Sequence, residues 1–183
     1  GGHATPPMLY LGAAWTKVFG TSISSYRSFS AFFGVLFVFG SYLFSLRIWR
    51  SKDAAWLSAL CAALSPWAFQ FSRIAWDPAL APAFLALGFA FFFTMGPHAL
   101  RWAALGGLMA SASAYAYPPI RVQLMLVVPA AFIVARFIDR KQFRGRAAAF
   151  LLPLVFTLLP LIVLTFRGDN QRRFKVLSVF NEN

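Results

Sequence analysis

The chain has 183 residues, of which 60% are hydrophobic, 18% are aromatic and only 12% are charged. Because an ordinary soluble domain carries about 25% charged residues, this composition excludes such a domain and predicts a polytopic membrane protein. Lys and Arg number 17 against 5 Asp and Glu, which gives a formal net charge of +12. The basic residues fall in short segments between apolar runs, so we expect them to set membrane topology and to meet anionic lipids, and not to bind nucleic acid.

The opening segment, residues 1–27, is expected to form a loop at the membrane surface. Its run 8–19 is too short to span a bilayer and carries Trp15 and Lys17, which prefer headgroup depth, so it predicts an interfacial helix. His3 is interpreted either as a solvated loop histidine or as a phosphate or metal contact. The chain begins without Met and without the pattern of a signal peptide, and we therefore expect a fragment of a longer protein.

Residues 28–166 are expected to form a region of six transmembrane helices. Uncharged apolar runs suited to about 20 helical residues recur there between clusters of cations. Pro66 is expected to bend the second span, and the Gly, Ala and Ser residues of the fourth should let neighbouring helices approach closely. The predicted fold class is all-α, a transmembrane bundle of about six spans with an interfacial juxtamembrane helix and a polar tail, 167–183. The expected spans cover about 28–46, 54–72, 78–95, 102–120, 121–139 and 147–166.

Six spans place both ends of the chain on one side of the membrane. The connections at 47–52, 101 and 136–146 carry nine Lys and Arg residues, against eight on the other side, four of them in the tail. Among the short connections this count favours 47–52 and 136–146 as cytoplasmic. We therefore expect an integral protein of the plasma (inner) membrane whose ends and active face are extracytoplasmic. Arg73 and Arg121 then face outward against the usual bias, which favours a functional use for them.

A cation and a carboxylate, Arg73 and Asp77, stand four residues apart between two long apolar runs. One interpretation is structural: Asp77 caps a helix that begins at Pro78, and Arg73 satisfies the end of the preceding helix or reaches the headgroups. The other is functional: both side chains face a water-filled cavity, where Arg73 holds an anionic headgroup and Asp77 meets a polar substrate. The two interpretations are compatible.

The segment 115–121, with the sequence YAYPPIR, again combines aromatic residues, prolines and an arginine at a membrane boundary. Tyr115 and Tyr117 suit either a binding pocket or the aromatic belt of a membrane protein. The sequence has no Gly-rich phosphate loop, paired-histidine zinc pattern or serine nucleophile elbow. Its single cysteine, Cys61, excludes an internal disulfide. An enzymatic function must therefore depend on the polar and charged residues at the membrane boundaries, such as Arg73, Asp77 and Arg121.

Six short stretches carry a family resemblance through their order and spacing. Together they resemble the GT-C type membrane glycosyltransferases that depend on dolichyl- or polyprenyl-phosphate sugars, a group that includes protein O-mannosyltransferases and lipid A aminoarabinose transferases. The stretches are PPMLY at 6–10, WTKVFG at 15–20, RSFSAFFG at 27–34, LSP at 64–66, FSRIAWD at 71–77 and YAYPPIR at 115–121.

The resemblance implies an inverting transfer of a sugar from a polyprenyl-phosphate donor to a lipid, glycan or protein acceptor at the extracytoplasmic face. Such enzymes usually carry an acidic base in the first outward loop, and we expect this chain to start beyond that carboxylate. The site residues implied by the resemblance are Asp77 as a catalytic carboxylate, Arg73, Arg121 and His3 as contacts to the donor phosphate, and Tyr115 and Tyr117 as lining of the sugar or lipid pocket.

Two other functions stay open at this point, a segment of a polytopic transporter and a non-catalytic membrane scaffold. A transporter should place ionisable groups near mid-membrane, whereas the charged residues here can be assigned near span ends. A scaffold would be favoured if Arg73, Asp77 and Arg121 faced headgroups on separate sides of the bundle. The sequence identifies no cofactor and no metal site, and it leaves open whether a divalent metal is needed.

Overall fold

The computed structural model describes residues 5–73 and 79–166. These residues form eight α-helices and no β-strand, which confirms the predicted all-α fold. In chain order the helices are α1 (Pro6–Phe19), α2 (Ile23–Trp49), α3 (Lys52–Leu64), α4 (Pro66–Arg73), α5 (Leu80–Phe92), α6 (Ala99–Ala116), α7 (Ile120–Ile138) and α8 (Phe143–Phe166).

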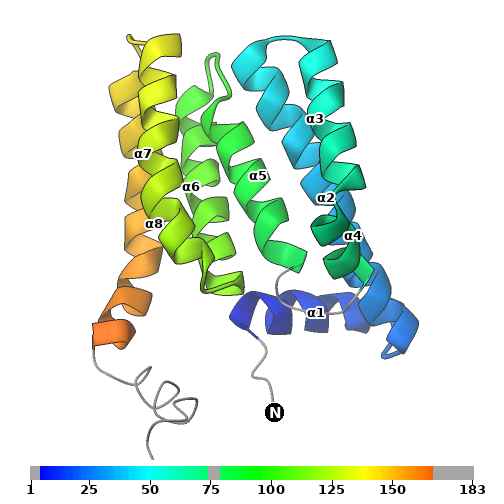
Figure 1. The fold of residues 1–183 in the computed structure, drawn as a ribbon. Coiled ribbons are helices and arrows are strands. Elements are labelled where there is room, and N and C mark those ends of the chain that lie inside the picture. Colours follow the sequence, from blue (N-terminus) through cyan, green and yellow to red (C-terminus); the bar gives the residue numbers. More distant parts are fainter. Residues whose placement is uncertain (1–4, 74–78, 167–183) are drawn as a thin grey trace, which may run out of the picture.

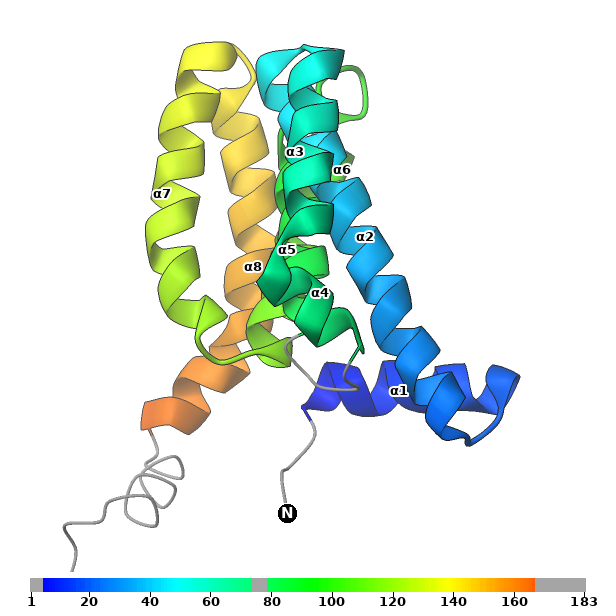
Figure 2. The same ribbon diagram turned by 45° about the vertical axis from the view of Figure 1, so that its right-hand side comes forward.

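Helices α2 to α8 stand side by side as a bundle, and α1 lies across one end of it (Figure 1, Figure 2). We call this the α1 end; it also holds the end of α4, the start of α5, the end of α6 and the start of α7. The opposite end, which we call the connection end, holds the connections α2–α3, α5–α6 and α7–α8. The described chain therefore passes back and forth between two ends, with α3 and α4 sharing one pass.

Pro66 divides the expected second span into two helices. Proline disfavours helical backbone in the residue before it, and Ser65 is extended, with φ −62° and ψ 117°. Helix α3 therefore ends at Leu64 and α4 begins at Pro66, so the predicted bend is a complete break.

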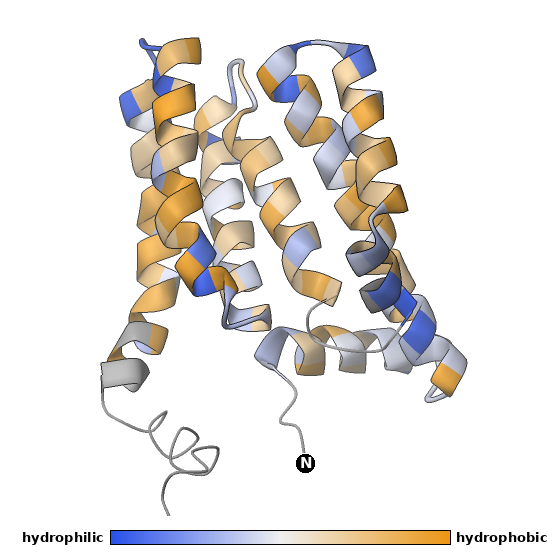
Figure 3. Cartoon of the chain, in the orientation of Figure 1, coloured by the Kyte–Doolittle hydropathy of each residue, from blue (hydrophilic) through white to orange (hydrophobic). Residues whose placement is uncertain are grey.

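The hydropathy of the bundle fits a membrane. Three helices are long and apolar enough to cross a bilayer, namely α2, α7 and the part Phe143–Leu161 of α8, while α5 is apolar but shorter. Figure 3 shows apolar residues along the middle of the bundle and hydrophilic residues toward its two ends. The structure thus supports a helical membrane bundle in which six is the approximate number of spans.

Helices α5, α6 and α8 approach closely because glycines face backbone atoms between them. A Cβ atom on Gly88 would lie 2.9 Å from the carbonyl oxygen of Gly106, and one on Gly106 would lie 3.1 Å from the backbone nitrogen of Phe92. A Cβ atom on Gly107 would collide with the carbonyl oxygen of Phe150. This confirms the prediction that the small residues of the fourth span let its neighbours approach.

Trp15 holds α1 against α2. Its indole Nε1 donates a hydrogen bond to the Ser28 hydroxyl at 3.3 Å. Its ring centroid lies 5.7 Å from that of Phe29 and 5.4 Å from that of Phe32. The interfacial helix predicted for 8–19 is therefore present, and it begins at Pro6 because proline is well suited to a first helical turn.

Arg146 is buried at the connection end, with 1% of its surface exposed. Its Nη2 donates to the carbonyl oxygen of Phe92, the last residue of α5, at 2.5 Å, and its guanidinium lies 5.4 Å from the centroid of the Phe92 ring. Its Nη1 pairs with a carboxylate oxygen of Asp139 at 3.5 Å. The sequence grouped Arg146 with the cations of the connection 136–146. The structure corrects this: Arg146 lies in the first turn of α8, is buried, and contacts the end of α5 and the end of α7.

Candidate lipid groove and its charged end

A groove opens on the side of the bundle between α7 and the pair α3–α4. It has a volume of about 490 Å³. Helices α2, α3 and α4 contribute one side, α7 contributes the other, and α5 lies between them (Figure 1). The lining residues are Phe37, Ser41, Phe44, Ser58, Trp67, Pro82, Leu85, Ala86, Phe89, Tyr117, Ile120, Gln123 and Val127.

The groove is mainly aromatic and aliphatic, and its polar side chains are few. The Ser41 hydroxyl donates to the carbonyl oxygen of Phe37 at 2.8 Å, and the Ser58 hydroxyl donates to the carbonyl oxygen of Ser41 at 3.4 Å. These two hydroxyls are therefore bonded to backbone inside the bundle. Tyr117 and the exposed Gln123 lie where α6 ends and α7 begins, so they bring polar groups to the α1 end of the groove.

Arg121 stands at this same end, directly after the lining residue Ile120. Its side chain is half-buried, and its Nε donates to the carbonyl oxygen of Ala114 at 3.3 Å. Ala114 belongs to the last turn of α6, whose carbonyl groups lack helical partners. The hydrogen bond uses Nε and leaves the fork of the two Nη groups for another acceptor, and such a fork matches the oxygens of a phosphate.

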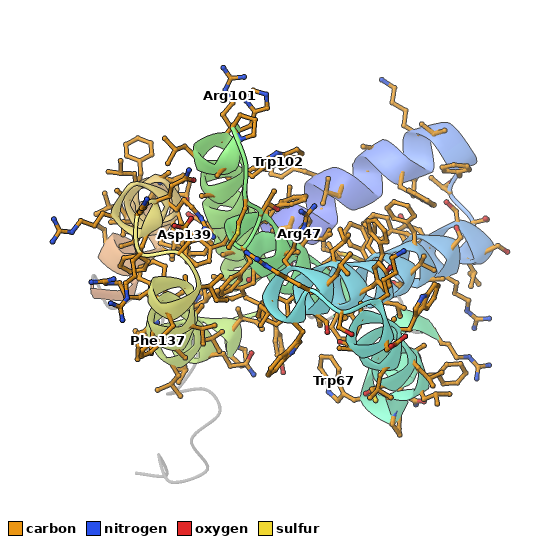
Figure 4. The ribbon with its side chains drawn as sticks, turned by 90° about the horizontal axis from the view of Figure 1, so that it is seen from above. Arg47, Trp67, Arg101, Trp102, Phe137 and Asp139 are labelled. Carbon is orange, nitrogen blue, oxygen red and sulfur yellow. The ribbon has the colours of Figure 1, made fainter. Side chains whose placement is uncertain are left out.

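Arg73 lies on a different face of α4 from the groove residue Trp67. It is the last residue of α4, is exposed, and lies with its guanidinium carbon 5.3 Å from the centroid of the Phe69 ring. The same short helix contributes Trp67 to the groove, and Figure 4 shows Trp67 on the side of the bundle where the groove opens. Because Phe69 lies about 200° around the helix from Trp67, the guanidinium of Arg73 lies on the face of α4 away from the groove, and Arg121 is the arginine that directly follows a lining residue.

The structure brings some of the predicted site residues together and separates others. Tyr117 lines the groove beside Arg121. Tyr115 instead donates its hydroxyl to the carbonyl oxygen of Thr157 at 2.6 Å and so joins α6 to α8. Asp77 and His3 lie outside the described residues.

Sequence reasoning did not single out Trp67 and Gln123 as groove residues. Gln123 carries the only side-chain amide in the apolar sequence of α7, which is a signal that could have found it. Trp67 directly follows the proline break between α3 and α4. Neither signal indicates which way the side chain faces, because that depends on how the helices pack.

Charges and metal ligands are sparse in the middle of the described bundle. In residues 5–73 and 79–166 every charged residue lies near a helix end or in a connection, and the acidic ones, Asp53 and Asp139, belong to the connection end. Within the same ranges no group of three His, Cys, Asp or Glu side chains could hold a metal ion. Within the described residues the charged side chains thus lie near the ends of the helices, whereas a transporter would be expected to place some of them at mid-membrane depth.

The fold and the groove define a helical membrane protein with an open apolar groove next to Arg121, an arrangement suited to an amphiphile with an anionic head. A family model described as dolichyl-phosphate-mannose-protein mannosyltransferase matches residues 4–166. The chain belongs to this family of membrane glycosyltransferases, which confirms the resemblance to GT-C enzymes. Comparison with curated proteins and with solved structures gave no match.

Proposed function

We propose that this chain forms part of the membrane catalytic domain of a mannosyltransferase that moves mannose from a polyprenyl-phosphate donor to a protein hydroxyl. The description of the matching family supports both the donor and the acceptor class. The observation that carries the proposal is the apolar groove that ends beside Arg121. A polyprenyl phosphate has the matching build, a long apolar chain with an anionic head.

The groove residues and the arginines then have separate tasks. The polyprenyl chain lies along the apolar side chains of α2, α5 and α7, where its burial supplies binding energy. Transfer breaks the bond between the anomeric carbon of the sugar and the phosphate oxygen, so negative charge develops on the leaving phosphate. The Nη fork of Arg121 stabilises that charge, and Arg73 at the end of α4 is a second candidate contact.

The acceptor hydroxyl needs a base, which such enzymes usually carry in a first outward loop that we expect to precede this chain, and we assign to Asp77 the role of a second carboxylate that assists it. A carboxylate accepts the hydroxyl proton as the oxygen attacks the face of the sugar opposite the phosphate, which gives inversion. The described residues on either side of Asp77, Arg73 and Ala79, belong to the α1 end. The described carboxylates of Asp53 and Asp139 stand at the connection end. Addition of EDTA during the transfer assay tests whether a divalent metal is also needed.

Filling the groove tests the donor site. Val127 lines the groove, whereas Met125 on the same helix is 75% exposed on the outer surface. Val127→Trp should displace about two methylene groups of donor chain, about 1.6 kcal/mol, and so lower kcat/KM for a long-chain mannosyl donor by about tenfold. A short-chain donor should lose less. Equal losses for Val127→Trp and the control Met125→Trp, or no loss for either, would refute the assignment of the groove.

Substitutions of the residues proposed to contact the donor phosphate and the acceptor test the transfer step. They are made in the full-length protein and assayed in membranes at matched expression. Asp77→Asn should lower kcat, by up to about 10²- to 10⁴-fold if its carboxylate takes part in proton transfer, and Arg73→Ala and Arg121→Lys should both weaken transfer. Arg101→Gln, an exposed cation at the connection end, serves as the control and should transfer normally. The proposal is refuted if Asp77→Asn and the arginine variants keep full activity, or if the unmodified protein transfers mannose from none of the donors tested. A transporter or scaffold function would then be favoured.

Cysteine labelling tests the proposed sidedness, with the α1 end extracytoplasmic and the connection end cytoplasmic. Cys61, the single cysteine of this sequence, is exposed, and it and any cysteine elsewhere in the full-length protein must first be replaced by Ala. In that background a membrane-impermeant maleimide should label Thr21→Cys in intact cells, because Thr21 is an exposed residue between α1 and α2. Gln142→Cys in the exposed α7–α8 connection should react only after the cells are permeabilised. The reverse pattern would invert the topology.

A further inference from the structure

A second, smaller crevice lies at the connection end, on a different side of the bundle from the groove. Its volume is about 110 Å³. Figure 4 shows Trp102, which lines the crevice, and Trp67, which lines the groove, on opposite sides of the bundle. The crevice is bounded by the last turns of α2, the end of α5 and the first turn of α6. Its lining residues are Leu43, Arg47, Ala90, Phe91, Thr94 and Trp102.

The rim of this crevice is cationic. Arg47 lines it and is exposed. Arg50 donates from Nη2 to the sulfur of Met95, the residue after Thr94, at 3.1 Å. Arg101 directly precedes Trp102 and is exposed. Among the described residues, no acidic side chain lines the crevice, so its rim attracts an anion.

The other side chains of the crevice suit the depth of lipid headgroups. Trp102 is 41% exposed, and its ring centroid lies 5.2 Å from that of Phe91. Tryptophan prefers the interface between headgroups and acyl chains, where its ring is apolar and its N–H is polar. Leu43 and Phe91 add an apolar wall next to the cation. The hydroxyl of Thr94 is already donated to the carbonyl oxygen of Ala90 at 3.0 Å.

We propose that this crevice binds the headgroup phosphate of an anionic phospholipid from the surrounding bilayer. Arg47 holds the phosphate, Trp102 packs against the glycerol region, and the acyl chains run along the outer surfaces of α2 and α6. The volume of about 110 Å³ equals that of about four water molecules at about 30 Å³ each, which fits a phosphate group and excludes a whole lipid. The site is independent of the donor groove and of the proposed sugar transfer.

Native mass spectrometry of the full-length protein in detergent tests this proposal with phosphatidylglycerol and phosphatidylcholine as the added lipids. The protein should bind one phosphatidylglycerol at least about fivefold more tightly than phosphatidylcholine, since each arginine near an anionic lipid contributes about that factor. Arg47→Gln should lose about fivefold in phosphatidylglycerol affinity. Arg140→Gln, an equally exposed cation of the α7–α8 connection, is the matched control and should lose little.

Two further variants keep the test decisive. Arg47→Lys retains the charge and should keep most of the affinity, whereas Trp102→Leu should weaken binding without any change in charge. If Arg47→Gln does not elute as a folded protein in size-exclusion chromatography, Trp102→Leu decides the question. Equal affinities for the two lipids, or equal losses in Arg47→Gln and Arg140→Gln, would overturn the proposal, because binding would then be non-specific or spread over the whole basic end.

Discussion

Replacement of Arg146 by methionine should destabilise the bundle more than any other removal of a single described cation. Arg146 is 1% exposed and makes three contacts: a hydrogen bond to the Phe92 carbonyl oxygen at 2.5 Å, an ion pair with Asp139 at 3.5 Å, and a cation–π contact with the Phe92 ring at 5.4 Å. Methionine keeps a similar apolar stem but removes all three contacts. The ends of α5 and α7 then lose the residue that joins them to α8.

The size of the loss follows from these contacts. A hydrogen bond to a charged group contributes about 1.5–3 kcal/mol, and a cation–π contact contributes about 0.5–1 kcal/mol. The Asp139 side chain is 21% exposed, so water partly replaces its lost partner and the ion pair adds little. We expect Arg146→Met to lower the free energy of unfolding by about 3 kcal/mol, which lowers Tm by about 6–12 °C for a chain of this size.

Thermal unfolding of purified protein in detergent, followed by fluorescence-detected size-exclusion chromatography, measures this effect. Arg144→Met is the matched control, because Arg144 lies on the same helix two residues earlier and is exposed. The control should change stability by no more than about 0.5 kcal/mol. Asp139→Asn combined with Arg146→Met should cost less than the sum of the two single changes. Equal shifts in Tm for Arg146→Met and Arg144→Met would refute the role of Arg146 in joining the helix ends.

The remaining predictions concern helix packing and are measured by the same thermal assay. Gly107→Ala should strongly destabilise the protein because its Cβ would collide with the carbonyl oxygen of Phe150. Gly12→Ala should instead stabilise α1 by about 0.5–1 kcal/mol, since nothing lies within 4 Å of its Cβ. Similar changes in Tm for the two variants would contradict the close contact between α6 and α8. Tyr115→Phe should cost about 1 kcal/mol by removing the 2.6 Å hydrogen bond to Thr157, and an unchanged Tm would show that this bond contributes nothing.

Two tyrosines in one short segment show where prediction from the sequence stopped. Tyr115 and Tyr117 belong to the same aromatic boundary motif, and the sequence offered both as pocket residues. In the structure Tyr117 lines the groove while Tyr115 bonds to α8. Tyr115 lies in the last turn of α6, whereas Tyr117 follows the helix with extended backbone (φ −147°, ψ 114°), so the two side chains of one motif face different surroundings.

Arg144 and Arg146 differ in the same way. Both belong to one basic connection in the sequence, yet Arg144 is exposed and Arg146 is buried against Phe92. Composition identifies a basic cluster, but only the neighbouring ends of α5 and α7 determine which cation has partners. The crevice at Arg47 and Trp102 was missed for the same reason, because one wall comes from α2 and the others come from the consecutive helices α5 and α6, which are distant from α2 in the sequence.

The sequence by itself determined the membrane class, the all-α fold, the helix at 8–19 and the approximate ends of the spans. These features are local, because apolar runs, prolines and charged residues mark where a helix enters and leaves a bilayer. The tertiary structure decided which faces form the groove and which arginines are buried. In a membrane the faces toward lipid and toward other helices are both apolar, so the sequence pattern of a span does not distinguish them, and packing alone does.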